Sequence, residues 1–169
     1  MFWKQSGAEF GKMSSEPNRL AFKSIVESGT IPGILVYQEN DPAGWCAIQP
    51  RDSYARLARA RVLAPVDTQP VWSITCFYIG RQYRQKGLMR GLVNAAIDWA
   101  ESNGAHIVES YPFDTKERMS TSAAYMGLTP VFLEAGFAEV LRKSPRCPIM
   151  RKYLYYAISS MQKLRRIAE

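Results

Sequence analysis

Cysteine and histidine are scarce in this chain of 169 residues, which has three cysteines and a single histidine. Cys46, Cys76 and Cys147 are odd in number and widely spaced, so they fit neither a disulfide framework nor a zinc site. We therefore expect reduced, buried thiols and no metal ion. Cys76 could instead act as a nucleophile, but no sequence feature links it to His106 as a base.

Long apolar stretches, repeats and linkers are missing too. No stretch approaches the roughly 20 apolar residues that a membrane-spanning helix needs, and no apolar signal-peptide core follows the first residues. We therefore expect a cytoplasmic protein without a membrane span. With 47% apolar and 22% charged residues, the composition is that of a globular protein. The length suits one domain, which we place at residues 1–169.

Acidic residues are outnumbered, and the formal net charge is +7. Basic side chains gather at 81–90, where no acid accompanies them, and again from residue 142 to the C-terminus. A basic protein attracts anions such as nucleic acid, acidic membrane surfaces or a phosphorylated cofactor. The second cluster is also compatible with an ordinary solvated surface.

Hydrophobic periodicity predicts an alternation of helices and strands along the chain. We expect helices at 17–28, 53–62, 88–102 and 130–135, the last one capped by Thr129. We expect strands at 34–37, 45–49, 71–79, 106–111, 137–141 and 149–155. An amphipathic helix is predicted at 156–167, where it could pack on the body or support a homodimer. The order strand, glycine loop, helix, strand across 71–111 predicts a right-handed crossover, so these two strands should be parallel.

The loop before the helix at 88–102 has the chemistry of a phosphate site. A helix N-terminus presents unpaired N–H groups and partial positive charge. Gly87 removes a Cβ that would keep a phosphate from the backbone, and Arg84 and Lys86 add positive charge. The loop matches neither the P-loop pattern nor the dinucleotide fingerprint.

The run from Ile79 to Leu92, IGRQYRQKGLMRGL, resembles the acetyl-CoA motif of the GNAT acetyltransferases. The run from Val131 to Phe137, VFLEAGF, is similar to a second hallmark of that family. The resemblance implies an α/β fold of the α+β type: a mixed, mostly antiparallel sheet of about six or seven strands with a central, splayed parallel pair, flanked by helices. It implies acetyl-CoA as acyl donor, an amine of a small molecule or peptide as acceptor, and direct transfer in a ternary complex.

The resemblance also implies where CoA binds. The pantetheine arm would lie against the end of the first splayed strand, and the pyrophosphate against the basic loop and the start of the helix. The implied cofactor residues are Phe77, Tyr78, Ile79, Arg84, Gln85, Lys86, Gly87, Leu88, Met89, Arg90 and Phe132. The sequence departs from the family twice: Met89 replaces a small residue, and Phe132 occupies the usual place of a tyrosine that protonates the departing thiolate.

Two residues are candidates for catalysis. Glu109 lies in an otherwise apolar strand. Burial without a partner cation would raise the pKa of its carboxyl group toward neutral pH, which suits a general base. The alternative is a structural ion pair with an arginine, and Asp114 and Glu117 are then the reserve bases. Tyr125 is the candidate acid, with Tyr111 behind it, and both could instead be pocket wall.

Two other functions remain open from the sequence. Phe132 raises the possibility of a CoA-binding protein without catalysis, and the positive charge raises that of a nucleic-acid-binding module. Nucleic acid is the less favoured partner, because the basic residues are not interleaved with aromatic ones on one element.

Overall fold

The computed structural model describes residues 2–5, 7–12, 15–114 and 124–154. Six strands form one sheet in the order β1-β2-β3-β4-β6-β5. Neighbouring strands are antiparallel except for the central pair β3–β4, which is parallel. This confirms the predicted fold class. The strands are β1 (Gly33–Gln38), β2 (Asp41–Pro50), β3 (Trp72–Ile79), β4 (Ile107–Ser110), β5 (Ala138–Leu141) and β6 (Ile149–Tyr153).

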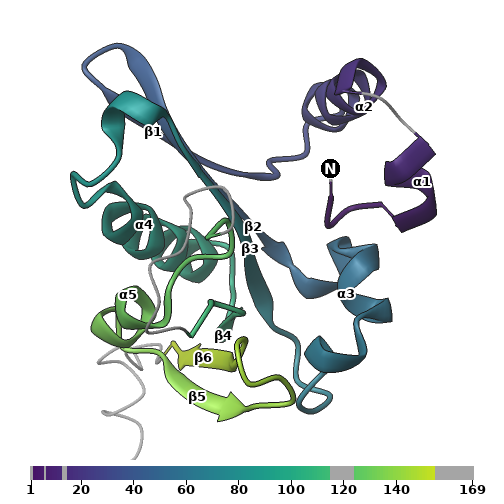
Figure 1. Cartoon of the computed structure of the whole chain (residues 1–169), viewed down its shortest axis with the longest axis vertical. Helices are drawn as coiled ribbons and strands as arrows, with labels where there is room; N and C mark the ends of the chain where they lie inside the picture. The colour runs from purple at the N-terminus through teal and green to yellow at the C-terminus, as the bar shows by residue number, and fades with distance from the viewer. Residues whose placement is uncertain (1, 6, 13–14, 115–123, 155–169) are drawn as a thin grey trace, which may run out of the picture.

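Helices cover both faces of this sheet. Figure 1 shows α4 and α5 on one side, and the N-terminal helices with α3 on the other. The α-helices are α1 (Gly7–Lys12), α2 (Ser15–Glu27), α3 (Ala55–Arg59), α4 (Leu88–Ser102) and α5 (Thr129–Glu134). Short 3-10 turns are η1 (Arg51–Ser53), η2 (Arg61–Leu63) and η3 (Arg81–Tyr83). The predicted helix at 156–167 lies outside the described residues.

Two apolar clusters form the core, one on each face. The α4 face packs Ile48, Ile74, Leu92 and Phe132. The opposite face packs Trp3, Tyr54, Leu57, Tyr111 and Ile149. Each fully buried side chain of this size contributes about 1.5–3 kcal/mol. The second cluster brings the N-terminal residues against the middle of β3, where Cys76 packs against it.

The long helix α4 buries a face that is rotated from the expected one. The sequence predicts a stripe of Leu88, Leu92, Ala95, Ala96, Trp99 and Ala100. The buried residues are instead Leu92, Val93, Ala96, Ile97 and Ala100, whereas Ala95 is exposed. The two sets share Leu92, Ala96 and Ala100. The helix turns Val93 and Ile97 rather than Ala95 toward the sheet, because the branched side chains bury more apolar area than alanine does.

Three further local expectations need correction. The region 53–62 is not one helix but η1, α3 and η2. Of the three residues that the sequence predicts to point inward, Tyr54 and Leu57 are buried, whereas Ala58 is exposed. Thr129 is the first residue of α5 rather than its cap, and its hydroxyl donates to the Phe113 carbonyl at 3.2 Å. On α2, the spacing predicts a shared face of Leu20, Ala21, Ser24, Ile25 and Ser28. Leu20 is instead exposed, and Phe22 makes the contact with the sheet, edge-on to Trp45.

Several basic residues after position 142 have structural partners. Arg142 forms ion pairs with Asp114 and Glu139, and Lys152 donates to the Ala135 carbonyl at 2.6 Å. Arg151 is buried in an ion-pair network. Within the described residues, three of the five basic side chains of this cluster therefore have structural partners, whereas Lys143 and Arg146 are exposed. None of the described helices is long and apolar enough to cross a membrane.

Candidate functional site

The parallel pair β3–β4 stays together over only three residue pairs. Thr75 is the cause: it has no partner on β2, whereas Ile74 and Cys76 on either side of it pair with Ile48 and Ala47. Such a bulge inserts one extra residue and bends its strand. Beyond it, β3 continues beside β2 alone, so an opening forms between the ends of β3 and β4.

Residues 124–128 border this opening. The Phe77 N–H donates to the Tyr125 carbonyl at 2.6 Å, and Leu128 forms a parallel bridge with Phe113. Gly127 is required in this segment, because its φ is +86° and a Cβ there would lie 2.7 Å from a ring carbon of Phe132. The segment therefore reaches from β3 to the chain that follows β4.

The basic loop between β3 and α4 closes the same end. Arg84 Nε donates to the Ile79 carbonyl at 2.9 Å, which ties the loop to the last residue of β3. Gln85 and Gly87 both adopt positive φ, at 62° and 75°. Gly87 precedes α4 without a side-chain cap, and nothing lies within 4 Å of the position that a Cβ would take. The first N–H groups of α4 therefore face open space, as an anion site needs.

A cavity of about 690 Å³ lies where these elements meet. Ligand pockets typically have volumes of about 300–1,000 Å³. Its walls include eight of the eleven residues expected to bind the cofactor: Phe77, Tyr78, Ile79, Arg84, Gln85, Gly87, Leu88 and Met89. Cys76, Tyr83, Ala124, Tyr125 and Leu128 complete the lining.

The other three expected cofactor residues lie off the cavity wall. Arg90 Nε donates to Glu134 at 2.7 Å, which joins α4 to α5. The Lys86 ammonium lies 5.8 Å from the centre of the Tyr83 ring. Phe132 is fully buried, and its ring packs edge-on against Phe77 at 6.1 Å. It thus supports a wall residue from behind.

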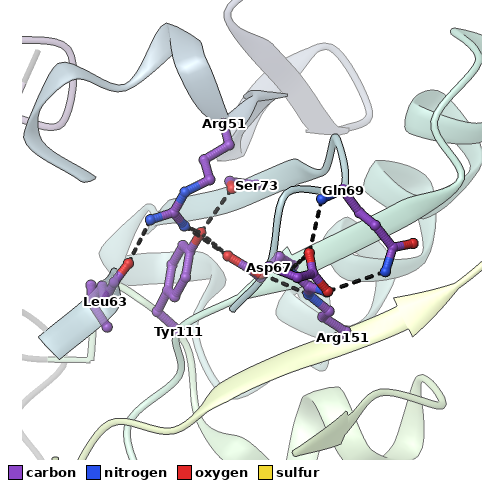
Figure 2. A network of polar contacts seen from close by, with 8 residues as sticks. Arg51, Leu63, Asp67, Gln69, Ser73, Tyr111 and Arg151 are labelled. Atoms are coloured by element: carbon purple, nitrogen blue, oxygen red, sulfur yellow. Dashed lines mark hydrogen bonds and ion pairs between the residues drawn. The ribbon is translucent and has the colours of Figure 1, made fainter. Parts of the chain in front are cut away.

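Glu109 does not line this cavity. It lies in a buried network with Arg51, Tyr111 and Arg151, and Figure 2 shows how these three partners lie. Its carboxylate accepts hydrogen bonds from Arg51 Nη1 at 2.7 Å, from the Tyr111 hydroxyl at 2.6 Å and from Arg151 Nε at 2.8 Å. Arg151 also pairs with Asp67 at 2.7 Å. Glu109 has no exposed surface, and two guanidinium groups hold its charge. Of the two roles that the sequence allows for Glu109, these contacts fit the structural ion pair with an arginine.

The sequence profile described as "Acetyltransferase (GNAT) family" matches residues 3–119. The chain belongs to this family. A GNAT acetyltransferase is an acyltransferase that uses acetyl-CoA. Most of the residues that line the cavity between the bulged strand and α4 lie within the matched range. No curated protein matches the chain significantly in sequence.

Solved structures share the GNAT fold at low sequence identity. A ribosomal-protein-alanine N-acetyltransferase from Brucella melitensis is 14% identical, with a TM-score of 0.52 over 84% of this chain and 80% of that one. A Salmonella typhimurium protein assigned as an acetyltransferase and solved with its cofactor acetyl-CoA is 15% identical, with a TM-score of 0.55 over 86% and 78%. At this identity they show the fold alone.

Tyr125 and Cys76 lie at a junction between two cavities. Both line the 690 Å³ cavity, and both also line a smaller cavity of about 260 Å³ bordered by Phe2 and Trp3. Burial raises the pKa of Tyr125, so its hydroxyl stays protonated at neutral pH. Burial also raises the pKa of the Cys76 thiol. A protonated thiol is a poor nucleophile, which disfavours the nucleophile alternative.

The reserve candidates lie elsewhere. Asp114 forms an ion pair with Arg142, and Tyr111 contributes its hydroxyl to the Glu109 network. Burial, and then the charge of Glu109, raise the pKa of Tyr111. Glu117 lies outside the described residues. Over the described part of the chain, no three His, Cys, Asp or Glu side chains are grouped to hold a metal ion.

Proposed function

We propose that this GNAT enzyme transfers the acetyl group of acetyl-CoA directly to an amine of a small molecule or peptide in a ternary complex. The 690 Å³ cavity is the observation that carries the proposal. One end is the start of α4 behind Gly87, suited to the pyrophosphate. The other end is the bulged part of β3 at Cys76, where a thioester would lie beside the opening toward the second cavity.

The reaction needs few groups from the protein. The neutral amine nitrogen attacks the acetyl carbon, an N–C bond forms, and the C–S bond breaks. The amine proton leaves to solvent, and the thiolate takes a proton. Holding both reactants in contact accounts for much of the rate gain in such reactions.

We assign the protonation of the thiolate to Tyr125. Its ring lines both cavities, and its hydroxyl keeps a proton at neutral pH. Phe132 cannot take this role, because it has no proton to donate. We do not assign Glu109 as a general base, because its carboxylate oxygens accept hydrogen bonds from Arg51 and Arg151.

CoA binding is tested by two glycine variants at the two ends of α4. Gly87 and Gly104 have φ of +75° and +82°, and both would place a Cβ in open space. Valine at either position should therefore cost a similar free energy of unfolding, roughly 1–3 kcal/mol. Only Gly87 lines the cavity. We expect saturating CoA to raise the melting temperature of wild type and Gly104→Val, but not of Gly87→Val.

Turnover is then followed as CoA thiol released from acetyl-CoA in the presence of an amine panel. A wild-type protein whose melting temperature does not respond to CoA would refute the proposed function. A protein that binds CoA but acetylates no amine would support the cofactor site and refute the proposed transfer to an amine.

A further inference from the structure

Three smaller cavities meet the cofactor cavity on the far side of β3. Their volumes are about 90, 260 and 390 Å³, and Phe2 and Trp3 line all of them. Each also shares Cys76 or Tyr125 with the cofactor cavity. We refer to these three cavities together as the N-terminal pocket. An acceptor bound there would reach the thioester at the junction of Cys76 and Tyr125.

Four buried polar atoms in the walls of the N-terminal pocket have no hydrogen-bond partner in the described structure. They are Trp3 Nε1, the Tyr54 hydroxyl, Arg56 Nη1 and Thr75 Oγ1. Tyr54 and Thr75 are 2% and 0% exposed. Burial raises the pKa of Tyr54, and the nearby Thr75 hydroxyl offsets part of this rise. The two hydroxyls still do not meet in a well-formed hydrogen bond.

The chemistry of these atoms is one-sided. All four can donate a hydrogen bond, and the indole and guanidinium nitrogens can do nothing else. Buried donors are normally paired in folded proteins. Tyr54 and Thr75 line the smallest cavity, Arg56 lines the largest, and Trp3 lines both. Unpaired donors in the walls of these adjoining cavities therefore indicate a ligand that brings oxygen acceptors.

The charge of the pocket points the same way. Lys4, Arg56 and Arg59 contribute to its lining, and none of the lining residues is Asp or Glu. Burial lowers the pKa of Lys4, as expected where no carboxylate compensates the lost solvation. A second cationic group on the acceptor would find no counter-charge here. An anionic oxygen would find Lys4 at the smallest cavity, or Arg56 and Arg59 at the largest one.

The remaining walls are aromatic. Phe2, Trp3, Phe22, Trp45, Tyr54 and Tyr125 border the pocket. The Arg56 guanidinium lies 3.7 Å from the centre of the Phe2 ring. The backbone N–H of Arg56 donates to the Trp3 carbonyl at 3.2 Å. These contacts join the N-terminal segment to α3 and fix both the aromatic surface and the cation.

We propose that the acceptor of this enzyme is an apolar α-amino acid, whose carboxylate binds at Arg56 and whose side chain lies among the aromatic residues of the N-terminal pocket. The amino group then lies at the junction of Cys76 and Tyr125 and is acetylated. The inference rests on the proposed function and narrows it from amines in general to this class.

The test compares matched amines at saturating acetyl-CoA. L-Phenylalanine, L-leucine and L-tryptophan are compared with phenethylamine, which lacks the carboxylate, and with spermidine and L-lysine, which add a cation. We expect kcat/KM for L-phenylalanine to exceed that for phenethylamine about 10- to 100-fold, the size of one hydrogen bond to a charged group. Spermidine or phenethylamine as the best substrate would overturn the inference while leaving amine acetylation intact.

Arg56→Gln supplies the second arm. It should raise KM for L-phenylalanine and leave phenethylamine unchanged, so that the preference between the two disappears. Arg61→Gln is the matched control, because Arg61 is exposed and does not line the pocket. A preference that survives Arg56→Gln would refute the assigned carboxylate site.

Binding is measured separately from turnover, by calorimetry of L-phenylalanine with the CoA-bound protein. Binding that is lost in Arg56→Gln and kept in Arg61→Gln supports the pocket. Absence of L-phenylalanine, L-leucine and L-tryptophan binding to wild type overturns the inference, whether or not other amines are acetylated. The CoA-induced rise in melting temperature confirms that each variant is folded.

Discussion

Replacing Glu109 with glutamine should destabilise the protein rather than remove a catalytic base. The carboxylate is 0% exposed, and its partners Arg51 and Arg151 have side chains 10% and 2% exposed. Glutamine keeps the shape but removes the charge, and its amide NH2 would meet guanidinium N–H groups that also donate. Removing one partner of a buried ion pair costs about 3–5 kcal/mol. For a chain of this size, that corresponds to a fall in melting temperature of roughly 6–20 °C.

The assay combines urea unfolding with turnover. Glu134→Gln is the control, because Glu134 pairs with Arg90 where both side chains are more than half exposed. An exposed pair is worth about 0–1 kcal/mol, so this variant should unfold almost like wild type. Folded Glu109→Gln should keep a turnover number within a few-fold of wild type. A stable Glu109→Gln protein whose turnover falls about 10²- to 10⁴-fold, the usual size of general-base catalysis, would refute this reasoning and make Glu109 the base.

Three further predictions concern single side chains. Tyr125→Phe should lower kcat about 10²-fold at unchanged CoA affinity, and an unchanged kcat would show that the thiolate leaves without it. Gly127→Ala should cost roughly 2–5 kcal/mol in urea unfolding, because positive φ and contact with the Phe132 ring both oppose a Cβ. Arg151 lowers the pKa of Asp67 from 3.8 to about 2. The stability from that pair is therefore present above pH 4 and lost between about pH 4 and 2; Asp67→Asn should flatten this part of the stability curve, and an unaltered slope would show that the pair contributes nothing.

Most of the fold could be predicted, because the elements are encoded locally. The run of apolar and β-branched residues before Gly80 predicts β3, and the change to helical spacing at Leu88 predicts α4. All six described strands overlap their expected ranges, and the crossover from β3 to β4 is parallel as expected. The residues at 40–44 are typical of a turn, so the sequence predicts the β1–β2 connection there. The structure instead puts Asp41 and Pro42 in β2, where Pro42 pairs only with the edge strand β1 and needs no second partner.

The features missed in the site depend on tertiary contacts. Nothing in the sequence around Thr75 distinguishes a bulge from a regular strand, because the extra residue is defined only by the register with β2. The N-terminal pocket was missed as well. Its one local signal was Phe2-Trp3, two large aromatic residues close to the first residue, which would be costly to leave in solvent. Without α3 and β3 beside them, the cavity that they line could not be inferred.

Glu109 illustrates why a buried acid cannot be interpreted from sequence alone. Its cations come from 58 positions before it and 42 after it. Those separations carry no signal, because Arg51 follows β2 and Arg151 lies on β6, which reaches β4 only through the sheet order. Arg151 and Glu109 are direct cross-strand partners, so the pair is a consequence of register. The same register puts Glu109 opposite Ser73, on the side of the bulge where β3 and β4 are still paired. Under the proposed function, the reaction takes place in the opening beyond Thr75. Glu109 lies where the two strands are still paired, and it therefore lies outside that opening.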